Sequence, residues 1–235
     1  IHKFGQESRA IIERSRLKIA NLLGCDLSEI IFTGCGTESN NIAMLGLLSK
    51  NDHLITTSYE HPAVLKTANE LELKGVEVSY IKPDQYGIIN SIEIKNAIKE
   101  NTKLVSVMHV NNELGTENSI DEISQITNDM GVLFHTDAVQ SIGKKNINLR
   151  DTKIDLLSLS AHKFYGPKGI GALFMRNGVN LMPTYFGGGQ EKDLRPGTEN
   201  ISYIHGMAIA LELAVKDCET WHKKLSNLES LFLKN

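Results

Sequence analysis

The chain has 235 residues, of which 41% are hydrophobic and 23% are charged, which is typical of a soluble domain with a sizeable core. A net charge of −3 gives no basic footprint for nucleic acid. No stretch approaches the roughly 20 apolar residues that a membrane helix needs, and the first residues lack the pattern of a signal peptide. Three irregularly spaced cysteines, Cys25, Cys35 and Cys218, predict reduced thiols in a cytoplasmic protein.

Apolar periodicity predicts helices and strands that alternate along the chain. In the first half we expect a helix over 6–23, a strand over 29–32, a helix through 41–48, a strand over 53–57, a helix from Pro62 to about 74, and a strand over 76–81. In the second half we expect a helix over 91–99, a strand over 104–110, a helix over 120–130, and strands over 132–134, 154–159 and 170–175. A final helix is expected from 201 to about 233, with a break near Asp217.

The two termini both fall within helical patterns, so we expect the chain to be part of a longer protein. The predicted large domain covers residues 1–215, and residues 216–235 form a helix that leads towards a smaller C-terminal domain. Alternating strands and helices predict an α/β fold, a mostly parallel sheet with helices on both faces. In such sheets ligands bind at the carboxyl ends of the strands.

A glycine-containing turn, residues 33–37, lies between the first strand and the second helix. This arrangement directs backbone N–H groups and the positive end of a helix towards an anion. The spacing is neither that of a Walker motif nor that of a dinucleotide-binding turn. The turn is therefore a candidate phosphate site, with an ordinary tight turn as the alternative.

Four polar residues follow or end predicted strands: His61, Asn112, Asp137 and Lys163. Taken singly, each has an ordinary explanation as a loop histidine, a turn amide, a paired carboxylate or a surface lysine. Because the carboxyl ends of parallel strands meet at one edge, the four side chains are expected to converge. The convergence favours a functional site.

Lys163 belongs to the segment over residues 160–169, where a buried strand passes into a turn rich in glycine and proline. Partial desolvation of such a lysine favours the neutral amine, which can attack a carbonyl carbon. A Schiff-base lysine, a strand-end carboxylate and an anion-binding turn together suggest pyridoxal 5'-phosphate (PLP). Lys163 would hold the aldehyde and Asp137 would meet the ring nitrogen. The phosphate would lie on four residues: Gly36, Thr37, Ser160 and His162.

The chain resembles cysteine desulfurases of the NifS/IscS type, within the class V aminotransferases, and most closely the NifS-like branch. The resemblance is carried by FTGCGTESNN (32–41), EHPAVL (60–65), MHVNNELG (108–115), FHTDAVQ (134–140), SAHKFYGPKGIG (160–171) and GGGQEKDLRPGTEN (187–200). These segments are similar to the family in order and spacing along nearly the whole chain. The resemblance implies the large domain of the type I fold of PLP-dependent transferases.

The resemblance also implies roles for single residues. Lys163 would bind the cofactor and move protons, and His61 would lie over the ring and act in acid–base steps. Gln140 would bond the ring hydroxyl, near Asn112. Thr198 would reach the phosphate of a neighbouring subunit, which implies a homodimer. The implied substrate is L-cysteine, and the implied partner is a sulfur-acceptor protein serving iron–sulfur cluster assembly, nitrogenase maturation or tRNA thiolation.

The family's nucleophilic cysteine and its carboxylate-binding arginine have no counterpart in this sequence. We therefore expect a desulfurase as the parent protein and no persulfide formation by this chain alone. Two alternatives are another class V aminotransferase or lyase, and a PLP-binding scaffold without turnover. A metal site built from the histidines is a further alternative, although no metal-ligand spacing is present.

Overall fold

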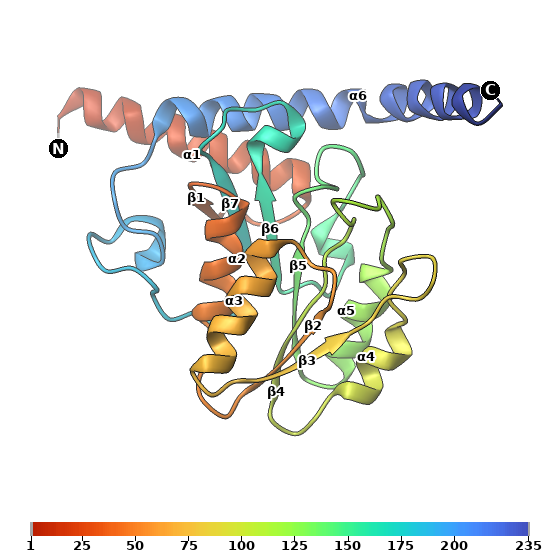
Figure 1. Ribbon diagram of the computed structural model, residues 1–235. Helices are drawn as coiled ribbons and strands as arrows, with labels where there is room; N and C mark the ends of the chain where they lie inside the picture. Colours follow the sequence, from red (N-terminus) through yellow and green to blue (C-terminus); the bar gives the residue numbers. More distant parts are fainter. Residues whose placement is uncertain (1, 235) are drawn as a thin grey trace.

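The computed structural model describes residues 2–234, whose strands form one seven-stranded sheet in the order β1-β7-β6-β5-β4-β2-β3 (Figure 1). The strands are β1 (Ile30–Thr33), β2 (His53–Thr57), β3 (Glu77–Ile81), β4 (Thr102–Ser106), β5 (Leu133–Asp137), β6 (Leu156–Ser160) and β7 (Gly171–Met175). The neighbours from β6 to β3 are parallel, whereas β7 is antiparallel to both β6 and β1. The predicted mostly parallel sheet is confirmed.

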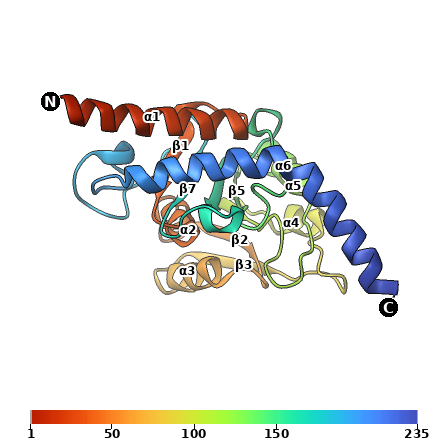
Figure 2. The same cartoon turned by 90° about the horizontal axis from the view of Figure 1, so that it is seen from above.

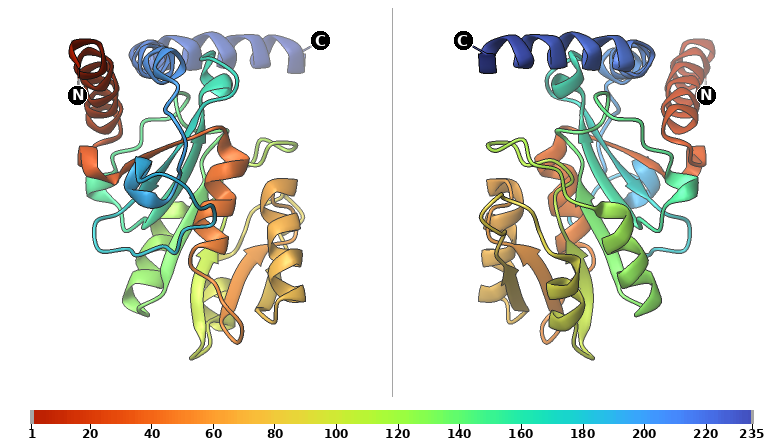
Figure 3. Two further views of the ribbon diagram at one scale, coloured as in Figure 1. Left: turned by 90° about the vertical axis from the view of Figure 1, so that its left-hand side faces the viewer. Right: turned by 90° about the vertical axis from the view of Figure 1, so that its right-hand side faces the viewer.

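Six α-helices are described: α1 (Lys3–Leu23), α2 (Gly36–Leu45), α3 (Pro62–Leu73), α4 (Ser91–Ala97), α5 (Ile120–Asp129) and α6 (Ile201–Lys234). The side chains of β1 alternate between two apolar cores, as the period of a strand requires. Ile31 packs in the core that contains α2 and α3, and Phe32 packs in the core that contains α1, α4, α5 and α6. Helices therefore cover both faces of the sheet, as predicted, and α1 and α6 lie side by side (Figures 2 and 3).

One edge of the sheet holds the carboxyl ends of six strands, all except β7. The strands β2, β3, β4, β5 and β6 are parallel, so they end together. The strand β1 is antiparallel to β7, which is antiparallel to β6, so β1 ends at this same edge. The segments that follow these strands carry the candidate site.

The structure corrects two predicted boundaries. The strand predicted over 104–110 ends at Ser106, because the chain then folds into a loop in which the amide of buried Asn118 donates to the carbonyl of Met108. The last helix continues without interruption through Asp217, so the predicted break is wrong, although the helix changes direction along its length (Figure 2). Within residues 2–234, none of the helices combines the length and apolar character needed to cross a membrane.

Candidate active site

A cavity of about 320 Å³ lies at the carboxyl edge of the sheet. Nine of the ten predicted site residues line it: Gly36, Thr37, His61, Asn112, Asp137, Gln140, Ser160, His162 and Lys163. The structure also adds Cys35, Asn40, Met108, Glu113 and Val139 to its wall. Thr198 is exposed and instead lines a separate recess beside α1. The strand ends therefore bring together every predicted residue except Thr198.

The glycine turn after β1 forms one wall of this cavity. Gly36 begins α2, and a β-carbon there would lie 2.6 Å from the Cγ2 atom of Val139, so no larger residue fits. The first helical bond of this turn runs from the amide of Ser39 to the carbonyl of Cys35. The N–H groups before Ser39 precede the helix's own bonding pattern and remain as donors for an anion.

Asp137 is the last residue of β5, and its side chain is only 5% exposed. Its Oδ2 atom accepts a hydrogen bond from the Asn40 amide at 2.7 Å, and its Oδ1 atom accepts one from the Val139 backbone at 3.0 Å. Burial raises the pKa of the Asp137 carboxyl, and these two donors oppose the rise, as do the charges of His61 and Lys163. Each carboxylate oxygen keeps lone-pair capacity for a further donor.

His61 is the N-cap residue of α3, and the proline after it suits the first helical position. The Nδ1 atom of His61 accepts a hydrogen bond from the backbone N–H of Ala63 at 3.0 Å. The accepting nitrogen cannot carry a proton, so the neutral ring holds its proton on Nε2. His61 can thus offer an N–H to a group in the cavity.

Lys163 lies on a short 3-10 turn, Ala161–Phe164, that directly follows β6. The turn is closed by Tyr165 in the left-handed region, at φ 64°. Next to the lysine, the Ser160 hydroxyl and the His162 Nδ1 atom lie 2.9 Å apart. Burial lowers the pKa of His162, and the charges of Lys163 and Lys168 lower it further.

The loop after β4 supplies Asn112 and Glu113, whose side chains are joined by a hydrogen bond of 3.0 Å. The preceding residue, Asn111, organises this loop: its Oδ1 atom accepts the backbone N–H groups of Glu113 and Leu114. On the opposite wall, the Gln140 Oε1 atom accepts a hydrogen bond from Lys144 at 3.1 Å. Amide and carboxylate groups therefore surround the part of the cavity between β4 and β5.

Glu60, next to His61, is a buried carboxyl group that the sequence did not single out. Its Oε1 atom accepts hydrogen bonds from the Thr57 hydroxyl at 2.7 Å and from the Met108 backbone at 2.9 Å. Its Oε2 atom is buried without a hydrogen-bond partner. Burial raises the pKa of Glu60 to about 8, the two donors oppose the rise, and the charge of Asp137 adds to it.

The histidines that could have formed a metal site serve other purposes. The two ring nitrogens of buried His135 contact Ser106 at 2.8 Å and Ser158 at 3.0 Å, on the two neighbouring strands. Burial lowers the pKa of His135 to about 3, so this ring is neutral. No group of three or more His, Cys, Asp or Glu residues in the described part of the chain is arranged to hold a metal ion.

Two polar residues that bear on the site were not singled out from the sequence: Asn40, which lines the cavity, and Glu60, which lies next to His61. Asn40 lies four residues after Gly36, on the same face of α2, and this spacing could have indicated it. Its Oδ1 atom is buried without a hydrogen-bond partner, so the site has spare acceptor capacity here. Glu60 had no such signal, because its burial depends on how two loops pack.

The fold and the cavity define an α/β protein with a candidate ligand site at the carboxyl edge of a mostly parallel sheet. The chain belongs to the class-V aminotransferase family, whose model matches residues 1–234. Over its whole length it is 45% identical to cysteine desulfurase IscS of Dictyoglomus turgidum and to a cysteine desulfurase of Mus musculus. It spans 60% and 52% of the length of these two relatives.

Solved structures with a similar fold include two further relatives. A NifS-like protein is 39% identical with a TM-score of 0.96, over 99% of this chain and 66% of that one. SspA in complex with cysteine is 44% identical with a TM-score of 0.88, over 90% of this chain and 63% of that one. The predicted resemblance to NifS/IscS-type desulfurases and the predicted type I fold are confirmed.

Proposed function

We propose that the chain provides the PLP-binding large domain of a cysteine desulfurase. The reaction converts L-cysteine to L-alanine and leaves the sulfur on an enzyme cysteine as a persulfide. The observation that carries this proposal is the meeting of nine predicted site residues in one cavity. Similarity to desulfurases along the whole chain supports the choice of substrate.

The residues of the cavity fit PLP. Its volume of about 320 Å³ suits a small cofactor, since ligand pockets measure about 300–1,000 Å³. The turn at Gly36 has no room for a side chain and presents backbone donors, which suits a phosphate. The buried Asp137 carboxylate bonds to neutral donors and keeps lone-pair capacity for a protonated ring nitrogen.

PLP, when bound, supplies an electron sink for the bond that breaks at the α-carbon of the substrate. The chain's own groups bind and move protons. The Lys163 amine would hold the cofactor aldehyde and, when free, would take the substrate α-proton. Asp137 would keep the ring nitrogen protonated, and His61 would lie over the ring and act in acid–base steps. Gln140 would bond the ring hydroxyl, and Asn112 would lie near that hydroxyl and the substrate. The turn at Gly36 and Thr37 would hold the phosphate with Ser160 and His162.

The cysteines of this chain are poor candidates for the persulfide. Cys25 and Cys218 are buried free thiols, and burial raises the pKa of Cys25 to about 12 and also raises that of Cys218. A thiol in this state rarely forms the thiolate that accepts sulfur. Cys35 belongs to the turn proposed to hold the phosphate. We therefore propose that the chain by itself binds PLP but forms no persulfide.

A homodimer is part of the proposal, with Thr198 of one subunit reaching the phosphate held by the other. The exposure of large side chains close to the site supports a partner surface: Tyr165 is 91% exposed and Phe186 is 90% exposed. The sulfur would pass to an acceptor protein. The free state of all three cysteines supports a reducing compartment such as the cytoplasm.

Titration of the purified chain with PLP tests the proposal. We expect a visible absorption band of lysine-bound cofactor, which Lys163→Ala abolishes and Lys103→Ala, an exposed position on β4, leaves intact. In the parent protein, L-cysteine should yield alanine, whereas an aminotransferase would yield a keto acid. A chain that shows no band with PLP would support the scaffold alternative, and cysteine-dependent sulfide release by the chain alone would contradict the persulfide argument.

A further inference from the structure

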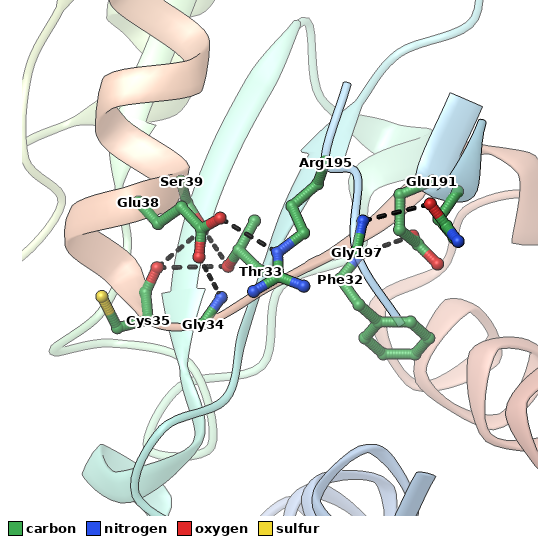
Figure 4. A network of polar contacts seen from close by, with 10 residues as sticks. Phe32, Thr33, Gly34, Cys35, Glu38, Ser39, Glu191, Arg195 and Gly197 are labelled. Carbon is green, nitrogen blue, oxygen red and sulfur yellow. Dashed lines mark hydrogen bonds and ion pairs between the residues drawn. The ribbon is translucent and has the colours of Figure 1, made fainter. Parts of the chain in front are cut away.

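The segment 187–200 returns to the glycine turn from far along the chain. Arg195 donates from Nε to the Oε1 atom of Glu38 at 3.0 Å, across 157 positions of sequence. The Oε2 atom of Glu38 accepts the backbone N–H of Gly34. Figure 4 shows Arg195 and Glu38 facing each other beside Gly34. One carboxylate thus connects the entry of the turn to the distant segment.

A second contact fixes the same segment four residues earlier. Glu191, whose side chain is 2% exposed, accepts two hydrogen bonds from Arg16, at 2.6 and 2.8 Å. It also accepts the backbone N–H of Phe32 at 2.7 Å (Figure 4). Phe32 and Gly34 are two residues apart and therefore point their N–H groups to the same side. The strand β1 is one of the two edge strands of the sheet, so these carboxylates cover backbone donors that would otherwise face solvent along β1.

The backbone of the segment is held in an unfavourable conformation. Glu191, Lys192 and Asp193 all lie in the left-handed region, with φ of 45°, 59° and 64°. Such residues persist where the surroundings determine their position strongly. Here the ion pairs of Glu191 and Arg195 hold both sides of the left-handed run. Loss of either contact would therefore remove a restraint on this unfavourable conformation.

The space around Gly34 shows how closely the turn and the segment fit. A β-carbon on Gly34 would lie 2.8 Å from Glu38 Oε2 and 3.8 Å from Arg195 Nη2. The guanidinium group therefore lies near the backbone of the turn, not only near the carboxylate. Cys35, Thr37 and Arg195 line one shared recess.

We propose that Glu38 and Arg195 are positioning residues that couple the phosphate-binding turn to the segment carrying Thr198. The proposal rests on the proposed function. The ion pair fixes the Gly34 amide and with it the direction of the donors at the start of α2. By thermodynamic linkage, a phosphate group bound at the turn then orders the segment, and ordering of the segment strengthens phosphate binding. In a dimer, cofactor binding would thereby fix the position of Thr198, which is proposed to reach the phosphate in the partner's site.

Amide hydrogen exchange of the ligand-free chain tests the coupling directly. Arg195→Met should accelerate exchange in the turn, residues 33–37, by about two- to fivefold, the size expected for one partly exposed ion pair. Glu38→Gln, which still accepts from Gly34, should accelerate exchange in residues 187–198 by a similar factor. The control Glu212→Gln removes another long-range ion pair, with Lys18, and should change neither region.

The double variant provides the stricter test. If the two residues act through each other, the double variant Glu38→Gln with Arg195→Met should weaken PLP binding no more than the more harmful of the two single substitutions, about two- to fivefold. Fold-changes that multiply, or a turn whose exchange is unchanged in Arg195→Met, would overturn the proposal. In the unsubstituted chain, PLP should slow exchange in both regions, and slowing in the turn alone would also overturn it.

The outcomes separate this proposal from the proposed function. If PLP produces neither an absorption band nor slower exchange at the turn, the cofactor assignment fails. The ligand-free comparison of Arg195→Met, Glu38→Gln and Glu212→Gln then still decides whether the turn and the segment are coupled.

Discussion

The buried carboxyl of Glu60 leads to a prediction about stability and pH. Its pKa rises from 4.5 to about 8 because burial disfavours the charged form. A group whose pKa is raised in the folded protein stabilises the fold fully below its unfolded pKa, and this stability is lost as the pH rises towards the folded pKa. At about 1.4 kcal/mol for each pH unit, the loss amounts to about 5 kcal/mol between pH 4.5 and pH 8.

The substitution Glu60→Gln should remove this loss. Glutamine has the shape of the neutral acid and keeps an oxygen to accept the bonds of Thr57 and Met108. The variant should match the unsubstituted chain near pH 4.5 and exceed its free energy of unfolding by about 3 kcal/mol at pH 7. Above pH 8 the difference should become constant, because Glu60 is then ionised in the folded and unfolded states alike.

Urea unfolding from pH 4.5 to pH 9 measures this difference in the free energy of unfolding. The contributions of ionisable groups that are present in both proteins cancel in the difference. Glu93→Gln, an exposed position on α4, is the matched control and should give a difference near zero at every pH. A flat difference for Glu60→Gln, or a variant that is less stable at pH 8, would refute the reasoning. Glu60 would then be ionised at neutral pH despite its burial.

Three further predictions concern other buried groups. Glu191→Gln should lower the free energy of unfolding by about 3–5 kcal/mol, because it leaves Arg16 without its buried counter-charge, and an unchanged urea midpoint would contradict this. Asn40→Leu should raise the pKa of Asp137 further, which carboxyl ¹³C NMR measures, since it removes a donor that favours the ionised form; a lower pKa would contradict the assigned contact. Gly36→Ala should weaken PLP binding at least tenfold, roughly the effect of 1.4 kcal/mol, while the chain stays folded, and unchanged affinity would show that the turn does not hold the phosphate.

The sequence predicted most helices and strands, and the meeting of the site residues, because both follow from the local pattern of apolar and polar residues. The strand 53–57 was predicted with its observed bounds, since a short apolar run is limited by polar residues. The positions of His61, Asp137 and Lys163 follow from one rule, that parallel strands end at the same edge. That rule needs no knowledge of which strands are neighbours.

Contacts between distant segments could not be predicted in this way. The Asn40–Asp137 bond depends on α2 packing across β5, and the Glu38–Arg195 pair depends on the path of an irregular segment. The burial of Glu60 arises because the Met108 backbone reaches it from another strand end. Each of these contacts arises from tertiary packing and leaves no periodic pattern in the sequence.

Two buried carboxylates show how the structure separates a stabilising role from a functional one. Glu191 is met by a guanidinium through two bonds, so its charge is compensated within the fold. Asp137 is equally buried, yet within residues 2–234 it forms no ion pair, and its two described hydrogen bonds come from uncharged donors. Burial raises the pKa of Asp137, so the folded chain carries a cost that a cation in the cavity would offset. A buried carboxylate that has neutral donors and no ion-pair partner suits the protonated ring nitrogen of the proposed cofactor.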